Sequence, residues 1–160
     1  MDVEVCWDTA ADQPAARVAA LRSMTAVSRG EKDEWLALFA PDAVVEDPVG
    51  PSMFDAEGKG HHGHEGISAF WDATIAHVVR FEFVIRDSFA NGAEVANIGT
   101  ITTFLPGNYR VDTDGVFIYR VGEDGLIRSM RAHWEPERAM ATARVVSDTE
   151  AAAPEPGTAV

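Results

Sequence analysis

The sequence predicts an α+β fold in a single domain, with helices in its first half and antiparallel strands in its second half. Apolar residues recur at helical spacing only before residue 80, whereas four later segments alternate between apolar and polar side chains. Turn-forming pairs such as Asn91-Gly92 separate these segments. A chain of 160 residues with 46% hydrophobic content is long enough to bury one sizeable core.

Three helices are predicted before the strands. The first begins at Pro14, which suits the first turn of a helix, and ends at Gly30, which suits the left-handed conformation after a helix. A second, short helix covers residues 31–39. A third covers residues 65–79, and its apolar stripe has spacings of three and four. The stripe consists of Ile67, Phe70, Trp71, Ile75 and Val78.

The predicted strands follow a period of two. One short strand covers residues 43–47, between the second and third helices. The others are predicted at residues 81–85, 95–104, 109–121 and 126–134.

The domain is predicted to span residues 14–136. Residues 1–13 are acidic and lack a sustained period, so we expect a loose arm, although Val3, Val5 and Trp7 could form a short edge strand. Residues 137–160 are rich in Ala, Pro, Glu and Thr, a composition that predicts a flexible tail.

The composition excludes several classes of function. A formal net charge of −13 disfavours binding to nucleic acid or to an anionic membrane, because phosphate groups require clustered Lys and Arg. The single Cys6 excludes an internal disulfide framework. No apolar run approaches the length of a membrane span and no signal sequence opens the chain, so we expect a cytoplasmic protein. A small, neutral and apolar ligand fits this composition best.

Asp47 is the residue whose position is least expected. Ala43, Val45 and Asp47 share one face of the strand at 43–47, so a carboxylate stands where a third apolar residue would be expected. Burial of a carboxylate is costly unless it is paired or protonated. Asp47 is therefore either a strand-end residue that bonds the turn at Pro48, or a general base whose pKa is raised by an apolar pocket.

Three segments resemble one enzyme family. Residues 38–50 resemble the segment of ketosteroid isomerases that carries their catalytic aspartate, and residues 125–132 resemble the final strand of that family. Residues 63–71 are similar to the third helix of ketosteroid isomerases and of SnoaL-like polyketide cyclases, both of the nuclear transport factor 2-like superfamily. The resemblance covers residues 15–135. It implies a cone of curved antiparallel sheet around three helices, with an internal cavity, no cofactor, and a homodimer formed through the outer sheet face.

The same resemblance implies roles for particular residues. Asp47 matches the aspartate that moves a proton next to a carbonyl group. The two groups that stabilise the resulting oxyanion in the family are replaced here by Ser23 and Phe117. Asn97 and Tyr119 are the expected substitute donors, and an ordinary buried position in the sheet is the alternative for each.

Four further residues are expected to shape the pocket, and one cluster is expected to cover it. The pocket residues are Trp71, Phe117, Met130 and Trp134. For Trp71 the alternative is a core position. His61, His62 and His64 lie in a Gly-rich stretch at 51–64 without the ordered spacing of a metal site. We therefore expect no metal there and a mobile cover over the pocket.

The function predicted from these residues is a cofactor-free cyclase or isomerase, with Asp47 as base or polar anchor. A polyketide cyclase that rearranges a bulky apolar carbonyl compound suits the altered donors best, because a cyclase gains rate by holding one reactive conformer. The alternatives are a steroid Δ-isomerase with substitute donors and a non-catalytic carrier of apolar ligands. Epoxide hydrolysis would need a second acid and an Arg beside Asp47.

Overall fold

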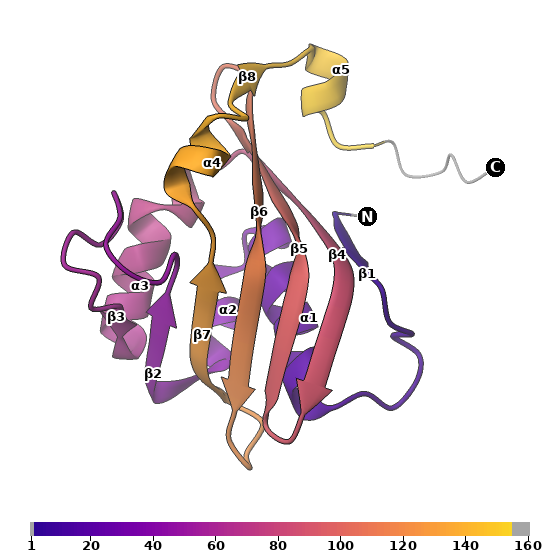
Figure 1. Ribbon diagram of the computed structural model, residues 1–160, viewed down its shortest axis with the longest axis vertical. Helices are drawn as coiled ribbons and strands as arrows, with labels where there is room; N and C mark the ends of the chain where they lie inside the picture. The colour runs from indigo at the N-terminus through magenta and orange to yellow at the C-terminus, as the bar shows by residue number, and fades with distance from the viewer. Residues whose placement is uncertain (1, 155–160) are drawn as a thin grey trace.

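A curved sheet wraps around the N-terminal helices in the computed structural model, which describes residues 2–154 (Figure 1). The helices are α1 (Ala15–Arg29), α2 (Lys32–Ala37), α3 (Gly63–Ala73), a 3-10 turn (Ile75–His77), α4 (Pro136–Met140) and α5 (Asp148–Ala151). The strands are β1 (Val3–Val5), β2 (Phe39–Glu46), β3 (His61–His62), β4 (Arg80–Asn91), β5 (Glu94–Leu105), β6 (Tyr109–Val121), β7 (Ile127–His133) and β8 (Arg144–Val145). The α+β architecture and the three N-terminal helices are confirmed.

The curved sheet is antiparallel at its centre, as predicted, and two parallel pairs towards its edges make it mixed. Its order is β1-β4-β5-β6-β7-β2-β3, and β8 pairs with β6 beside this path. Strands β4 to β7 form an antiparallel meander, whereas β1 is parallel to β4 and β2 is parallel to β7. Long connections join both parallel pairs, and no tight hairpin fixes the direction of those strands.

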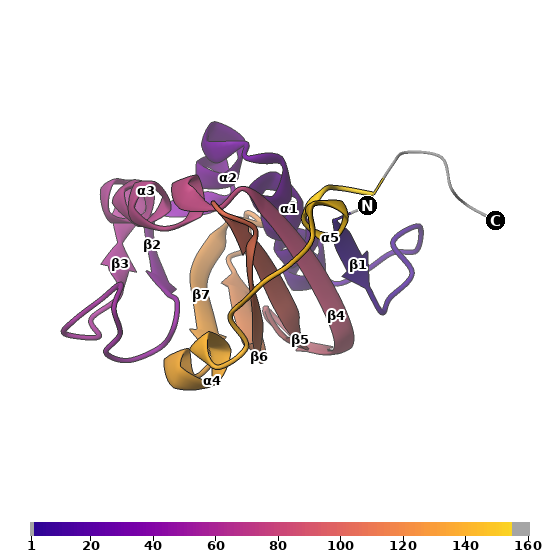
Figure 2. The same cartoon turned by 90° about the horizontal axis from the view of Figure 1, so that it is seen from above.

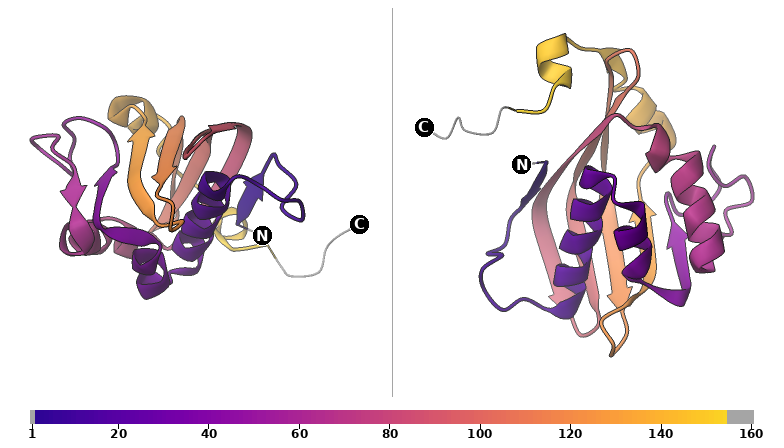
Figure 3. Two further views of the ribbon diagram at one scale, coloured as in Figure 1. Left: turned by 90° about the horizontal axis from the view of Figure 1, so that it is seen from below. Right: turned by 180° about the vertical axis from the view of Figure 1, so that it is seen from behind.

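Helix α1 lies across the concave face of the sheet, as the view from behind shows (Figure 3). Its buried side is built largely from small residues, which let the helix approach the strands closely. These residues are Ala16, Ala19, Ala20, Ser23 and Ala26. Gly30 ends the helix with a φ of 69°, as the sequence predicts. Among the described residues, no helix is long and apolar enough to cross a membrane.

Two facing glycines permit the sharp bend of the sheet beside the site. Gly99 of β5 and Gly115 of β6 are direct cross-strand partners, and the register of β4 against β5 shifts between Ile85 and Asp87. A Cβ atom at Gly115 would lie 2.6 Å from the carbonyl oxygen of His133. A side chain at Gly115 would therefore collide with the backbone of β7.

The N-terminal arm is not loose where β1 forms. Residues Val3 to Val5 pair with Phe83 to Ile85 of β4, and Val3 is buried. The alternative predicted for this segment, a short edge strand, therefore forms at Val3 to Val5, because the edge of β4 offers free backbone groups that a short apolar segment can satisfy. The third helix is also shorter than predicted, since it ends at Ala73 and a 3-10 turn follows.

The predicted flexible tail contains three ordered elements, α4, β8 and α5, so that prediction is wrong for residues 137–151. We call residues 135–151 the C-terminal strap. Seen from above, the strap runs from the end of β7 past β6 towards α5 (Figure 2). Ion pairs and backbone hydrogen bonds hold it, among them Arg110 to Glu150 at 2.8 Å. Residues 155–160 of the predicted tail lie outside the described residues.

Candidate active site

A cavity of about 410 Å³ lies between the helices and the concave face of the sheet. Helices α1 and α3 form one side, strands β4 to β7 form the other, and α4 closes one end. Most lining side chains are apolar. The polar exceptions are Ser23, Asp47, Thr74, His77, Thr103, Thr113 and Tyr119, with the indole of Trp134. Such a mainly apolar cavity with few polar groups is typical of a site for a small organic ligand.

Asp47 directly follows β2 and lines this cavity. The indole Nε1 of Trp134 donates a hydrogen bond of 2.6 Å to its Oδ1. Burial raises the pKa of the Asp47 carboxyl above its usual value, and the hydrogen bond from Trp134 partly opposes this rise. The carboxyl thus bonds a side chain in the cavity and not the turn at Pro48, and its role as a general base stays a prediction.

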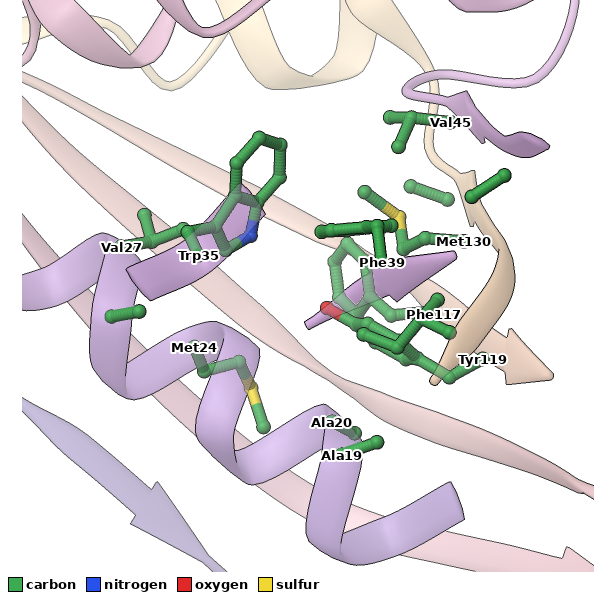
Figure 4. Close-up of a cluster of buried hydrophobic side chains, with 14 of the residues drawn as sticks. Ala19, Ala20, Met24, Val27, Trp35, Phe39, Val45, Phe117, Tyr119 and Met130 are labelled. Carbon is green, nitrogen blue, oxygen red and sulfur yellow. The ribbon is translucent and has the colours of Figure 1, made fainter. Parts of the chain in front are cut away.

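A second polar group in the cavity is built around Ser23 of α1. Its Oγ accepts a hydrogen bond of 3.0 Å from Trp35 Nε1 and one of 3.2 Å from the hydroxyl of Tyr119. The Trp35 nitrogen and the Tyr119 oxygen point towards one another (Figure 4). Both acceptor positions of Ser23 are then occupied, so its own hydroxyl hydrogen is left to donate to a ligand.

Tyr119 is a neutral donor in this cluster. Burial, and secondly the nearby charge of Asp47, raise the pKa of Tyr119 to about 12, although its bond to Ser23 opposes this. The Ser23–Tyr119 pair holds two hydroxyl hydrogens and uses one internally. One O–H is therefore free for a ligand in the same cavity as Asp47.

Five of the seven predicted site residues line the cavity: Asp47, Phe117, Tyr119, Met130 and Trp134. Sequence reasoning assigned Trp134 only an apolar surface and missed its hydrogen bond to Asp47. It also treated Ser23 as a lost donor. The Trp134–Asp47 and Ser23–Tyr119 hydrogen bonds both depend on contacts between segments far apart in the chain, namely β2 with β7 and α1 with β6.

Asn97 does not reach the cavity. It is fully buried, and its Oδ1 accepts a hydrogen bond of 2.7 Å from Ser88, whose hydroxyl in turn accepts one from Arg17 of α1. Its Nδ2 has no partner among the described residues. Phe117, its cross-strand partner, forms the cavity wall instead. Asn97 is thus corrected from a substitute donor to a buried polar residue beneath α1.

Trp71 is likewise a core residue. It is nearly fully buried and its ring centroid lies 5.2 Å from that of Trp35. Phe70, the preceding residue of α3, lines the cavity in its place. The alternative interpretation of Trp71, a position in the apolar stripe of a helix, describes its environment.

The three histidines near residue 60 have structural contacts. The Nε2 atoms of His62 and His64 lie 2.7 Å and 2.8 Å from the carbonyl oxygens of Lys59 and Phe39. The ring of His61 packs against Phe70 at 4.7 Å between centroids. Within residues 2–154, no three His, Cys, Asp or Glu side chains are placed to hold a metal ion.

The loop before these histidines contributes to the cavity mouth. Met53 and Phe54 line the cavity although both side chains are exposed, and the Phe54 ring lies 6.4 Å from that of Trp134. The loop therefore forms part of the cover over the site. Whether this cover moves stays a prediction from the sequence.

The fold and the cavity together define a member of the nuclear transport factor 2-like superfamily. The chain belongs to the SnoaL-like domain family, whose sequence model matches residues 20–130. The chain is 32% identical over 134 residues to the epoxide hydrolase LasB of Streptomyces lasalocidi. The aligned segment is 82% of this chain and 45% of LasB. It thus spans about half the length of that relative. A steroid Δ-isomerase of Nocardioides simplex is 30% identical over 120 residues, 75% of this chain and 89% of the relative.

Solved structures agree with this assignment. The Rv0760c protein of Mycobacterium tuberculosis superposes with a TM-score of 0.76 at 32% identity, over 84% of this chain and 98% of that one. The same protein has been solved in complex with estradiol-17β-hemisuccinate. The Δ5-3-ketosteroid isomerase of a Mycobacterium species superposes with a TM-score of 0.74 at 31% identity, over 82% of this chain and 98% of that one.

Proposed function

We propose that this protein catalyses proton transfer next to the carbonyl group of a bulky, apolar ketone, and that it is an isomerase of the steroid Δ-isomerase type. The observation that carries the proposal is the arrangement of Asp47 and the Ser23–Tyr119 pair in one apolar cavity. One group can move a proton, and the other can hold a carbonyl oxygen. The relatives with isomerase names support the same reaction class.

The reaction begins when the Asp47 carboxylate accepts a proton from the carbon between the carbonyl group and an isolated double bond. The electron pair of that C–H bond moves towards the carbonyl oxygen, and a dienolate forms. The free O–H of the Ser23–Tyr119 pair donates to this oxygen as negative charge develops on it. The protonated Asp47 then returns its proton to the far carbon of the dienolate, and a conjugated ketone results.

The raised pKa of Asp47 suits both halves of this cycle. A carboxylate with a raised pKa is a stronger base towards carbon, and its protonated form can still give the proton back. Trp134 donates to Oδ1 and holds the carboxyl in place, so the other oxygen is available for the substrate.

Turnover of an unconjugated ketosteroid, followed by the absorbance of the conjugated product, tests this function. Wild-type protein is expected to convert the substrate, and Asp47→Asn is expected to lower kcat by about 10²–10⁴-fold, the usual contribution of a general base. Glu46→Gln is the matched control, because Glu46 is the neighbouring carboxylate and pairs with Arg131 at 2.6 Å outside the cavity. No turnover by wild-type protein, or equal rates in wild type and Asp47→Asn, would contradict the proposal.

Cyclisation with epoxide opening is the second candidate. It shares ring closure with the polyketide cyclase predicted from the sequence, but the reacting group is an epoxide and not a carbonyl compound. The 32% identity to LasB favours it, and so does a carboxyl whose raised pKa lets it act as an acid. Asp47 is, however, the one carboxylate among the described cavity residues, so no second acid lies beside it. Failure of the ketosteroid, with Asp47-dependent consumption of a hydroxy-epoxide, would favour this candidate.

A further inference from the structure

The cavity has a second polar region, distant from Asp47. Thr103 of β5 and Thr113 of β6 both line it. Thr103 is the cross-strand partner of Val111, so Thr113 is its diagonal neighbour on the same face, close enough for both hydroxyls to reach one ligand atom. Neither hydroxyl bonds another of the described residues, whereas Thr100, Thr102 and Thr142 all do.

The spacing of the two polar regions corresponds to an elongated ligand. Phe117 pairs with Ala132 of β7, the residue after Arg131, and Arg131 pairs with Glu46, so Phe117 marks the level of Asp47 on β6. Thr113 lies four residues from Phe117 along the same strand. At the rise of a β-strand, four residues extend about 13 Å. Aromatic and aliphatic side chains line the space between, including Phe81, Phe83 and Ile101. A rigid, apolar skeleton with one oxygen at each end matches this order of polar, apolar and polar surfaces.

The C-terminal strap encloses this distant end. On the edge of β6 opposite β5, β7 pairs from Val116 onwards and β8 pairs at Tyr109 and Arg110. No described strand covers this edge between Arg110 and Val116. The strap fills the gap, because the Asp112 backbone N–H donates a hydrogen bond of 2.8 Å to the Thr142 hydroxyl. Met140, two residues earlier, lines the cavity.

The far end of the strap is fastened to β4 and β6. The Arg110 guanidinium pairs with Glu150 at 2.8 Å, and Arg80 donates to the backbone oxygens of Glu150 and Ala151 at 3.1 Å each. The family match ends at residue 130, so the strap follows the part of the chain that the family defines. The wall at this end of the cavity is accordingly built by a segment outside the family match.

We propose that Thr103 and Thr113, bordered by the half-exposed Met140, form a second subsite that binds a neutral oxygen at the far end of the substrate. The substrate class is then an elongated, otherwise apolar ketone with a ketone, hydroxyl or ether oxygen at its opposite end. A neutral group is specified because no Lys or Arg is among the described cavity residues, and a carboxylate would need one. This inference rests on the proposed function, since it places the reacting ketone beside Asp47.

Binding of two matched steroids tests the subsite. Androstenedione has a ketone at each end, and its analogue with a methylene in place of the far ketone lacks only the distant oxygen. Both are already conjugated, so the proposed reaction does not consume them. Quenching of tryptophan fluorescence gives Kd. Wild-type protein is expected to bind androstenedione about three- to tenfold more tightly than the analogue, the effect of one neutral hydrogen bond.

The variant Thr103→Val/Thr113→Val is expected to abolish this preference and to leave the affinity for the analogue unchanged. Thr113→Val alone is the milder variant and should reduce the preference. Thr100→Val is the matched control, because Thr100 lies on the same strand with its hydroxyl bonded to Asp114 outside the cavity. Met140→Ala should also weaken the preference, because it admits water to the subsite.

The outcomes separate this inference from the proposed function. Equal affinity of wild-type protein for the two steroids, or a preference that survives in the double threonine variant, overturns the subsite and leaves Asp47-dependent turnover intact. Failure of both steroids to bind contradicts the proposed function and the subsite together. A preference lost only in the threonine and Met140 variants supports the subsite.

Discussion

Asp47 is subject to two opposing influences at the scale of the single residue. Its apolar surroundings disfavour the charged carboxylate, whereas the Trp134 N–H stabilises that charge. The balance decides at which pH the carboxylate is available as a base. Sequence periodicity placed Asp47 on an inward face, but the residue that tunes it lies 87 positions away in the chain.

Replacement of Trp134 by Phe removes the opposing influence and keeps most of the apolar surface. The pKa of Asp47 should then rise further, because burial acts without the hydrogen bond. We expect the acid limb of the kcat/KM profile against pH to move to higher pH, with a loss of rate in acidic buffer that more alkaline buffer partly restores. A profile that falls uniformly at all pH values would show that Trp134 acts only through packing.

Ser23 and Tyr119 can substitute for one another. In Tyr119→Phe the Ser23 hydroxyl still donates to a ligand, and in Ser23→Ala the Tyr119 hydroxyl is released from its internal bond. Each single variant should therefore lower kcat by about tenfold or less. The double variant should lose about 10²–10³-fold, the usual effect of removing an oxyanion donor. Rate constants for the four proteins form a double-mutant cycle, and strict additivity would contradict a shared donor.

At the scale of the elements, the site depends on a close approach between β6 and β7. Gly115 has no side chain where the His133 carbonyl and the Cβ atom of Trp134 pass at 2.6 Å and 3.1 Å from the position of a Cβ. The Cβ atom of Trp134 therefore fits beside β6 while its indole reaches Asp47. A glycine in the middle of a strand, which weakens that strand in isolation, is here a condition for the site.

Gly115→Ala tests this dependence. The added methyl group should push β7 away and displace the Trp134 indole, with a loss of about 1–3 kcal/mol in the free energy of unfolding, typical of overpacking. Ketosteroid turnover should fall as well, with the acid limb shifted as in Trp134→Phe. Val116→Ala, one residue along and on the outer face, is the control for a general weakening of β6. Unaltered stability in Gly115→Ala would contradict the close approach.

At the scale of the whole molecule, the Asp47 carboxylate in its apolar surroundings lowers the free energy of unfolding. The raised pKa of Asp47 means that the folded protein holds the proton more tightly than the unfolded chain does. The contribution of Asp47 to stability is therefore present in acid and is lost as the pH rises through its folded pKa. The contribution of Asp112 to stability depends on pH in the opposite direction. Burial alone would raise the pKa of Asp112, but hydrogen bonds from Thr102, Arg144 and Arg110 lower it.

Asp47→Asn should consequently stabilise the protein at neutral pH. The amide keeps the shape of the carboxyl group and carries no buried charge. Urea unfolding should give a higher free energy of unfolding for the variant at pH 7.5, and the difference should shrink as the buffer is made more acidic and Asp47 of the wild-type protein takes up a proton. Asp112 is common to both proteins, so the difference isolates Asp47. A difference independent of pH would contradict the raised pKa.

Local signals in the sequence determined much of this molecule. The spacing of apolar residues and the turn residues specified three helices followed by a meander of strands, since these patterns act over a few neighbouring residues. The period of two in β2 was sufficient to single out Asp47. The segments around residues 38–50 and 125–132 also resembled ketosteroid isomerases closely enough to identify the superfamily.

Only the tertiary structure decided what each inward face meets. Asn97 and Thr103 lie on one face of β5, yet one is beneath α1 and the other is in the cavity. Phe70 and Trp71 are neighbours in α3, yet Phe70 lines the cavity whereas Trp71 packs against Trp35 in the core. Periodicity gives the side of an element but not the position of a cavity along it, because the cavity is bounded by helices from distant parts of the chain. The Trp134–Asp47 bond, the Ser23 cluster and the strap all depend on such distant contacts.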